Sequence, residues 1–235
     1  MTLRSQLKRA ARRLKPDRRR AFFRRWLPGE SLVFDVGAHT GELTVVFQDC
    51  GARVIAVEPQ RSCHGPLREV LRSQDELVRA AVGAQRGDAT LLIGAHPETS
   101  SLSSRFAQVY DTQASDGATE AVSVVTLDEL IEQFGEPHLI KLDVEGYEAE
   151  ALRGLSTPIQ TIAFEFNDRL LDVATQSIRA IAALAADYRF RLSPYERYEW
   201  AQPAALKAEA FLRSLDEMEL PLTGDIYATR ERKAQ

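Results

Sequence analysis

The chain has 235 residues, a mass of 26.3 kDa and a formal net charge of −4, which predict one domain with a sizeable core. With 44% hydrophobic and 27% charged residues, the composition excludes a disordered or fibrous protein. No apolar run approaches the ~18 residues that a membrane span needs, and no apolar segment follows the basic first residues, so we expect no signal peptide. Cys50 and Cys63 are too few for a disulfide framework or a zinc site, which fits a cytoplasmic location.

The charge is unevenly distributed. Residues 1–30 hold 11 Lys and Arg against two acids, so a basic arm precedes an acidic body. Apolar residues recur at helical spacing within this arm, and Pro16 divides it into two predicted helices, the second from Asp17 to Leu27. We therefore expect a basic helical extension over residues 1–29 and one domain over residues 30–235. Phe22, Phe23 and Trp26 are expected to face that domain.

Strands and helices alternate after the turn at Pro28 and Gly29. Strands are predicted at 32–36, 53–57, 77–82, 89–93, 122–125, 138–143, 159–166, 190–192 and 225–229. Helices are predicted at 41–49, 62–73, 126–135, 147–153, 177–186 and 203–215, and residues 94–119 are expected to form a long surface loop. This alternation predicts an α/β fold with a mostly parallel sheet that helices cover on both faces.

The segment 32–59 carries the clearest functional pattern. Asp35 ends the first predicted strand, Gly37 and Gly41 follow in a turn, and Glu58 ends the next strand. Ligands of open α/β sheets bind at these carboxyl ends, and an acid at the second strand suits a ribose diol.

The turn discriminates between two nucleoside cofactors. A dehydrogenase would show G-x-G-x-x-G after the first strand, but His39 stands where a middle glycine is expected. The carboxylate of Asp35 would repel a pyrophosphate and would suit a cation such as the ammonium of a methionine moiety. The segment therefore favours S-adenosylmethionine over NAD, whereas Glu58 fits the ribose of either.

A second group of charged residues follows the strand predicted at 138–143. Lys141, Asp143 and Glu145 lie at the tip of an otherwise apolar strand. Buried charges are costly without partners, so these residues either form a structural ion pair or line the cleft beside Asp35.

Several segments together resemble the FkbM family of S-adenosylmethionine-dependent methyltransferases. They are 35–41 (DVGAHTG), 57–59 (VEP), 126–128 (TLD), 141–146 (KLDVEG) with Glu148, and 224–225 (GD), and the similarity covers residues 31–230. The resemblance implies a Rossmann-like class I methyltransferase fold, with a seven-stranded sheet whose last strand is antiparallel. It also implies methylation of a hydroxyl, often on a sugar or natural product, with S-adenosylhomocysteine as the second product.

The resemblance assigns roles to residues of this chain. It implies that Glu58 holds the ribose and that Asp143 lies beside the transferable methyl group. His39 stands where the family commonly has Asn, and both side chains can donate a hydrogen bond to a carboxylate. A serine-bearing loop of the family corresponds to the segment with Ser100, Ser101 and Ser103. The residues expected to hold the methionine end are Asp35, Gly37, Ala38, His39 and Gly41.

A hydroxyl acceptor must lose a proton, so a general base is expected. The candidates, in order, are Asp143, Glu145, His39 and Glu165, and Lys141 would hold a cofactor carboxylate or lower the pKa of the acceptor. No metal is expected, because the sequence shows no clear cluster of oxygen ligands.

The acceptor should be covered by residues 96–119 and 194–222. In the second segment Tyr195, Tyr198 and Trp200, with Glu165 nearby, would bind the acceptor by stacking on a sugar or flat ring. The alternative is that these aromatic residues form a cluster in the core.

Other functions remain open at this point. The basic arm suits an RNA methyltransferase, although no Asn/Asp-Pro-Pro-aromatic motif follows the strand at 138–143. A non-catalytic binding protein would not need Asp35, Glu58 and Asp143, and a nicotinamide dehydrogenase is the third alternative. We expect a small-molecule acceptor, no membrane and no nucleic acid as partners, and we leave a homodimer open.

Overall fold

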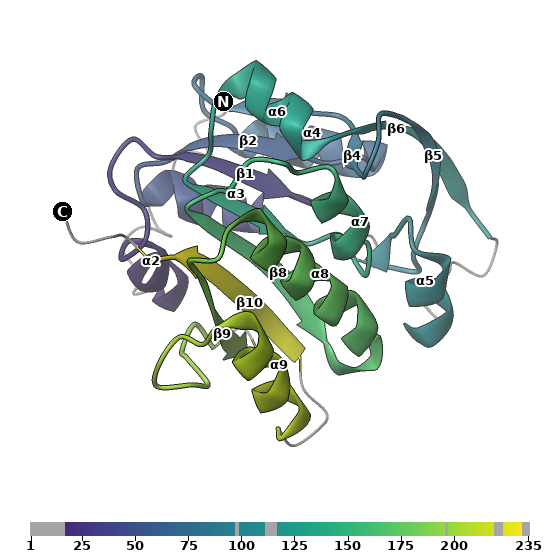
Figure 1. Cartoon of the computed structure of the whole chain (residues 1–235). Helices are drawn as coiled ribbons and strands as arrows, with labels where there is room; N and C mark the ends of the chain where they lie inside the picture. Colours follow the sequence, from purple (N-terminus) through teal and green to yellow (C-terminus); the bar gives the residue numbers. More distant parts are fainter. Residues whose placement is uncertain (1–16, 97–98, 111–116, 196, 219–222, 232–235) are drawn as a thin grey trace.

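The computed structural model describes residues 17–96, 99–110, 117–195, 197–218 and 223–231 (Figure 1). The first helix predicted for the basic arm lies outside these residues. None of the helices in the described part of the chain is long and apolar enough to cross a membrane.

A seven-stranded sheet with the order β3-β2-β1-β7-β8-β10-β9 forms the centre of the protein. Its first five strands are parallel, and β10 lies antiparallel between β8 and β9. This arrangement confirms the predicted α/β class and the antiparallel last strand. The strands are β1 (Leu32–Val36), β2 (Arg53–Val57), β3 (Glu76–Val78), β7 (Leu139–Leu142), β8 (Thr161–Asn167), β9 (Tyr188–Pro194) and β10 (Thr223–Arg230).

A second sheet of three strands has the order β4-β6-β5. Its strands are β4 (Ala81–Val82), β5 (Gly87–Leu92) and β6 (Thr119–Val125). The single strand predicted at 77–82 was wrong, because the chain changes sheets between Val78 and Ala81. Val78 pairs with Val57 of β2, whereas Ala81 pairs with Val124 of β6.

Helices cover both faces of the large sheet because its strands alternate buried apolar side chains between the faces. In β1, Phe34 and Val36 share a core cluster with α6, α7, α8 and α9, and Val33 shares another with α2 and α3. Figure 1 shows α7, α8 and α9 in front of the sheet and α3 behind it. The helices are α2 (Arg18–Phe23), α3 (Glu42–Asp49), α4 (Arg61–Val70), α6 (Leu127–Phe134), α7 (Glu148–Arg153), α8 (Leu171–Leu184) and α9 (Ala208–Asp216).

The segment expected to be a long loop contains a further helix, α5 (Ser104–Tyr110). Phe106 on this helix is buried, and its side chain lies against Gly146, where an added Cβ would come within 3.1 Å. The loop prediction was therefore wrong for these residues. A few apolar positions among polar ones gave no helical signal, since their packing partner lies forty residues further along the chain.

The helix α2 packs on the body through aromatic side chains, as expected for Phe22, Phe23 and Trp26. Phe22 is 3% exposed, and its ring centroid lies 4.9 Å from that of Trp200 and 5.3 Å from that of Tyr227. The boundary proposed between residues 29 and 30 therefore separates two segments that share one apolar cluster.

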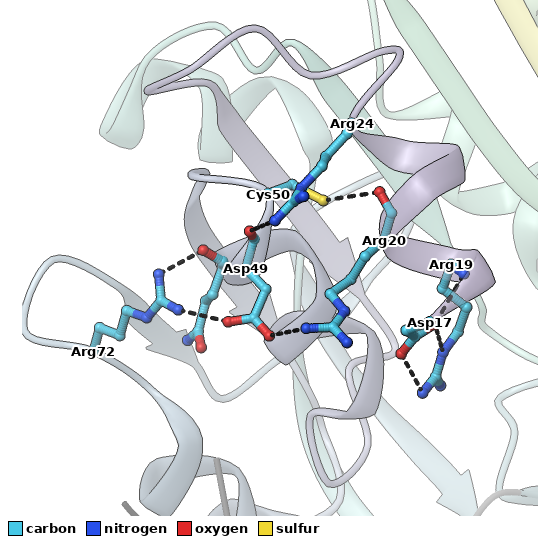
Figure 2. A network of polar contacts seen from close by, with 8 residues as sticks. Asp17, Arg19, Arg20, Arg24, Asp49, Cys50 and Arg72 are labelled. Atoms are coloured by element: carbon cyan, nitrogen blue, oxygen red, sulfur yellow. Dashed lines mark hydrogen bonds and ion pairs between the residues drawn. The ribbon is translucent and has the colours of Figure 1, made fainter. Parts of the chain in front are cut away.

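Polar contacts also connect this helix to the body (Figure 2). Asp49, at the end of α3, forms ion pairs with Arg20 at 3.7 Å and with Arg72 at 3.1 Å. Arg24 donates to the main-chain carbonyl of Asp49 at 3.4 Å, and Asp17 caps α2 by accepting from the backbone N–H of Arg19. Several arginines of the basic arm are thus engaged within the protein.

Candidate active site

The turn after β1 approaches the end of β7 at backbone distance. Gly37 has a φ of +80°, and a Cβ added to it would lie 1.7 Å from the carbonyl oxygen of Asp143. Gly41 has a φ of +87°, and its Cβ would lie 2.6 Å from Cγ2 of Val70. Both positions need glycine because of the left-handed conformation and the lack of space, so the spacing of this motif follows from its packing.

Glu58 connects this turn to the end of β2. Its carboxylate accepts hydrogen bonds from the backbone N–H groups of His39 and Gln60, each at 2.8 Å. The side chain is 6% exposed, and burial raises the pKa of Glu58 to about 7 against the opposing effect of these hydrogen bonds. Glu58 both shapes the turn and faces a cavity.

Asp35 lies beneath the turn. It is 2% exposed, and its carboxylate accepts a hydrogen bond from the hydroxyl of Thr44 on α3. Burial raises the pKa of Asp35 to about 6, while Thr44 and Lys141 oppose the shift. Asp35, Ala38 and Gly41 are not among the residues that line the two cavities described below, so the predicted contact of Asp35 with a cofactor ammonium stays a prediction.

The first cavity lies at the carboxyl ends of β1 and β2. It is lined by Val36, Gly37, His39, Val57, Glu58, Pro59, Gln60, Ala80, Ala81, Val82, Leu91, Ser100, Ser101, Leu102, Asp143, Val144, Glu145 and Tyr147. Ser101 donates a hydrogen bond to the carbonyl of Glu145 at 2.6 Å, which connects the segment after β5 to the segment after β7. Of the serines noted in the sequence, Ser100 and Ser101 reach this cavity.

Lys141 is a buried cation held by two carboxylates. The residue is 1% exposed, and its Nζ lies 3.2 Å from Oδ2 of Asp143 and 3.0 Å from Oδ1 of Asp225. Burial lowers the pKa of Lys141, but these two carboxylates outweigh it and raise the pKa well above its ordinary value. Lys141 therefore stays charged, and it orients Asp143 instead of accepting a proton.

Glu148 supports the segment after β7 from within. It is 2% exposed, and its Oε1 accepts from the backbone N–H groups of Val144 and Gly146, both at 3.2 Å. Burial raises the pKa of Glu148 to about 7. These bonds fix the loop that carries Asp143 and Glu145.

The second cavity has a volume of about 400 Å³, within the range of roughly 300–1,000 Å³ that is usual for small-molecule sites. It is lined by Arg19, Gly37, His39, Glu42, Leu43, Lys141, Asp143, Glu145, Glu165, Tyr195, Tyr198, Thr223, Gly224 and Asp225. The predicted acceptor residues Glu165, Tyr195 and Tyr198 are thus brought together here.

Trp200 is placed elsewhere. Its ring lies 4.9 Å from Phe22, 5.3 Å from Trp26 and 5.3 Å from Tyr227, centroid to centroid. Trp200 therefore belongs to the alternative aromatic cluster and is not among the residues that line the second cavity, and its stacking on an acceptor stays a prediction. The reason is that the apolar face of α2 covers it.

The two cavities share a wall. Gly37, His39, Asp143 and Glu145 line both of them. The Nε2 atom of His39 is buried and has no hydrogen-bond partner within the described residues, so a polar group of a ligand would satisfy it. A chemical group transferred from a ligand in one cavity to a ligand in the other would therefore move along this shared wall.

Three carboxylates converge at this wall. Asp143, Glu145 and Glu165 each place one oxygen within 4.8 Å of the others. All three were candidate bases, but a cluster of oxygen ligands was not predicted, because Glu165 comes from β8 and the other two follow β7. The predicted absence of a metal stays a prediction.

Three further residues of the site were not predicted. Thr44, the third residue of α3, donates a hydrogen bond to Asp35. Arg19 of the basic arm lines the second cavity, and Asp225 of β10 forms an ion pair with Lys141. Asp225 had a signal in the sequence, since it belongs to the segment 224–225 (GD), one of those that carry the resemblance. Arg19 had none, because it is one of many arginines in its segment.

The Methyltransferase FkbM domain matches residues 35–192, which is more than half of the chain. The chain belongs to the FkbM methyltransferase family. This confirms the resemblance, and the protein is an S-adenosylmethionine-dependent methyltransferase. No curated protein matches it.

Solved structures that resemble this FkbM methyltransferase have low sequence identity to it. Precorrin-6y C5,15-methyltransferase from Geobacter metallireducens is 11% identical with a TM-score of 0.49, covering 91% of this chain and 86% of that chain. A TehB-like SAM-dependent methyltransferase from Corynebacterium glutamicum is 11% identical with a TM-score of 0.47, covering 96% and 94%. An rRNA methylase from Streptococcus thermophilus is 13% identical with a TM-score of 0.44, covering 91% and 94%.

Proposed function

We propose that the protein transfers a methyl group from S-adenosylmethionine to a hydroxyl of a small molecule, a sugar or natural product, that binds in the second cavity. The observation that carries this proposal is the wall common to both cavities. It lets two ligands approach each other at Asp143, and each cavity has its own lining for one of them.

The residues that line the first cavity suit the cofactor, although its volume of about 60 Å³ means that the lining must move apart to admit it. Glu58 lies at the end of β2, where its carboxylate would accept hydrogen bonds from a ribose diol. The turn at Gly37 allows close approach of the backbone, and the unpartnered Nε2 of His39 would bind a polar group of the methionine end. When bound, S-adenosylmethionine supplies an electrophilic methyl group to the shared wall.

The protein's contribution is alignment and removal of a proton. In-line transfer requires the acceptor oxygen to be held against the methyl carbon in a cleft that excludes water. A C–O bond forms as the C–S bond breaks, and the hydroxyl proton passes to the carboxylate of Asp143. Lys141, whose Nζ lies 3.2 Å from Oδ2 of Asp143, holds the carboxylate of Asp143 in one orientation. Glu145 and His39 are the alternative candidates for the base.

A small acceptor is favoured over RNA. Within the described part of the basic arm, Arg20 pairs with Asp49, and Arg19 pairs with Asp17 and with Glu42. Arginines engaged with acids of the same chain contribute little to binding phosphates. The charged side chains that line the second cavity are five carboxylates and two cations, and this excess of negative charge would repel a polyanion.

The test has two stages. Calorimetry should first detect binding of S-adenosylhomocysteine, and its failure would remove the proposal altogether. S-adenosylhomocysteine formation is then measured with sugars, hydroxylated natural products and RNA, and the product is located by NMR. A new O–CH₃ signal is expected with a hydroxyl compound, whereas methylation of RNA alone would favour the alternative function.

A further inference from the structure

The second cavity is predominantly acidic. Its lining holds two cationic side chains, Arg19 and Lys141, and five carboxylates: Glu42, Asp143, Glu145, Glu165 and Asp225. Lys141 pairs with Asp143 and Asp225, and Arg19 lies 3.6 Å from Glu42. The two cations are thus already committed to three of the carboxylates, which leaves an excess of negative charge at the wall next to the cofactor.

Glu165 is one of the carboxylates of this cavity that neither Arg19 nor Lys141 pairs with. In the part of the chain that the structure describes, its side chain makes no hydrogen bond and no ion pair, although Asp225, its neighbour in the register of β8 and β10, pairs with Lys141. Burial, followed by the like charges of Asp143 and Glu145, raises the pKa of Glu165 well above its ordinary value. Burial and the neighbouring carboxylates destabilise the ionised form of Glu165, and a positively charged ligand in the cavity would stabilise it.

The other groups that act on Glu165 do not supply this charge. From β7 and the loop after it come Lys141, Asp143 and Glu145, from α7 comes Glu148, and Tyr110 of α5 is also within electrostatic reach. Among them only Lys141 is cationic, and its Nζ already contacts two other carboxylates.

The geometry favours an organic cation over a metal ion. A divalent ion between Asp143, Glu145 and Glu165 would lie close to the ammonium of Lys141, which is 3.2 Å from Asp143. This repulsion and the attraction to the three carboxylates both double with the charge of the ion, so the choice depends on the uncharged part of the lining. The cavity also has the side chains of Tyr195 and Tyr198 in its wall, and aromatic faces attract organic ammonium groups.

We propose that the acceptor is an amino alcohol, such as an amino sugar, whose protonated amine is bound by Glu165 while the hydroxyl to be methylated faces Asp143. This inference rests on the proposed function and names its substrate class. The amine anchors the acceptor from the β8 side of the cavity, and the hydroxyl then meets the wall shared with the cofactor.

The test compares three sugars of similar size whose charges are positive, neutral and negative. Methyl glucosaminide, methyl glucoside and methyl glucuronide are titrated by NMR into the protein saturated with S-adenosylhomocysteine. We expect the amine to bind most tightly and the carboxylate least tightly. Glu165→Gln should weaken binding of the amine by about 10- to 100-fold, the range for a hydrogen bond to a charged group, and should leave the neutral sugar nearly unaffected.

Glu42→Gln is the matched control, because Glu42 lines the same cavity but has Arg19 beside it. It should change binding of the amine far less than Glu165→Gln does. Equal effects of the two substitutions would attribute the preference to overall charge and overturn the role of Glu165.

Binding of the amine should also lower the pKa of Glu165, because the ammonium stabilises the ionised carboxylate. Calorimetry in two buffers of different ionisation enthalpy, repeated over a range of pH, measures the protons that accompany this shift, and Glu165→Gln should abolish them. The proposal fails if the three sugars bind equally while S-adenosylhomocysteine still binds, and the proposed function then survives. It also fails if Mg²⁺ binds to the protein and Glu165→Gln removes that binding, since the carboxylates would then belong to a metal ion.

Discussion

Replacing Phe22 by alanine tests whether the arm helix is part of the acceptor site. Phe22 is 3% exposed, and its ring contacts five other aromatic rings at centroid distances from 4.9 to 5.8 Å. Truncating a buried Phe to Ala costs about 3–5 kcal/mol. For a chain of this length each kcal/mol lowers Tm by roughly 2–4 °C, so we expect a decrease of about 6–20 °C.

The functional effect should be selective. Tyr198, a ring neighbour of Phe22 at 5.7 Å, lines the second cavity, whereas no residue of α2 lines the first. Below the lowered Tm, Phe22→Ala should therefore raise KM for the acceptor and leave the Kd of S-adenosylhomocysteine unchanged. Calorimetry and steady-state kinetics measure the two quantities.

The matched control is Arg18→Ala on the same helix. The side chain of Arg18 is 81% exposed and pairs only at 3.7 Å with Glu199, so this substitution should change Tm by less than about 2 °C. If Phe22→Ala also left Tm unchanged, α2 would not be packed as described. A loss of cofactor affinity equal to the loss of acceptor affinity would refute the separation of the two cavities.

The other predictions concern the cofactor and the transfer step. Glu58→Ala should weaken binding of S-adenosylhomocysteine by about 1–3 kcal/mol in calorimetry through lost ribose hydrogen bonds; an unchanged affinity would remove Glu58 from the site. Because the pKa of Glu58 is about 7 and its ionised form is the better acceptor, affinity should rise from pH 6 to pH 8, and Glu58→Gln should flatten this profile. Asp143→Asn should lower kcat more than cofactor affinity, and equal losses would reassign Asp143 to cofactor binding. Gly37→Ala should lower Tm and abolish S-adenosylhomocysteine binding because its Cβ would lie 1.7 Å from the carbonyl of Asp143; normal binding would contradict the close approach of the turn.

The strands of the large sheet were predictable because burial on both faces makes them continuous apolar runs. The predicted ranges 32–36 and 53–57 coincide with β1 and β2. Local capping was equally informative, since Thr126 and Glu129 form the capping box that begins α6. The wrong predictions concern elements that depend on packing with distant parts of the chain. Phe106 of α5 packs against Gly146, and the break after Val78 depends on the pairing of β4 with β6, about forty residues away.

The site divides in the same way. His39, Glu58 and Asp143 were found because each lies at the end of a strand or in a motif, and strand ends meet at one edge of a parallel sheet. Arg19 was missed because only the docking of α2 brings it to the cavity. The sequence left open whether Trp200 lines the cavity or joins an aromatic cluster, because it cannot show which aromatic residues of one loop pack against α2.

The wall shared by the two cavities has a consequence for the order and strength of binding. Any displacement of Asp143 or Glu145 by a ligand in the first cavity reshapes the second, and Ser101 extends this connection to the segment after β5 through the carbonyl of Glu145. Thermodynamic linkage then makes the coupling reciprocal: the factor by which the cofactor changes acceptor affinity equals the factor by which the acceptor changes cofactor affinity. A screen for acceptors should therefore be run both with and without the cofactor product, because the ratio of the two affinities measures this coupling.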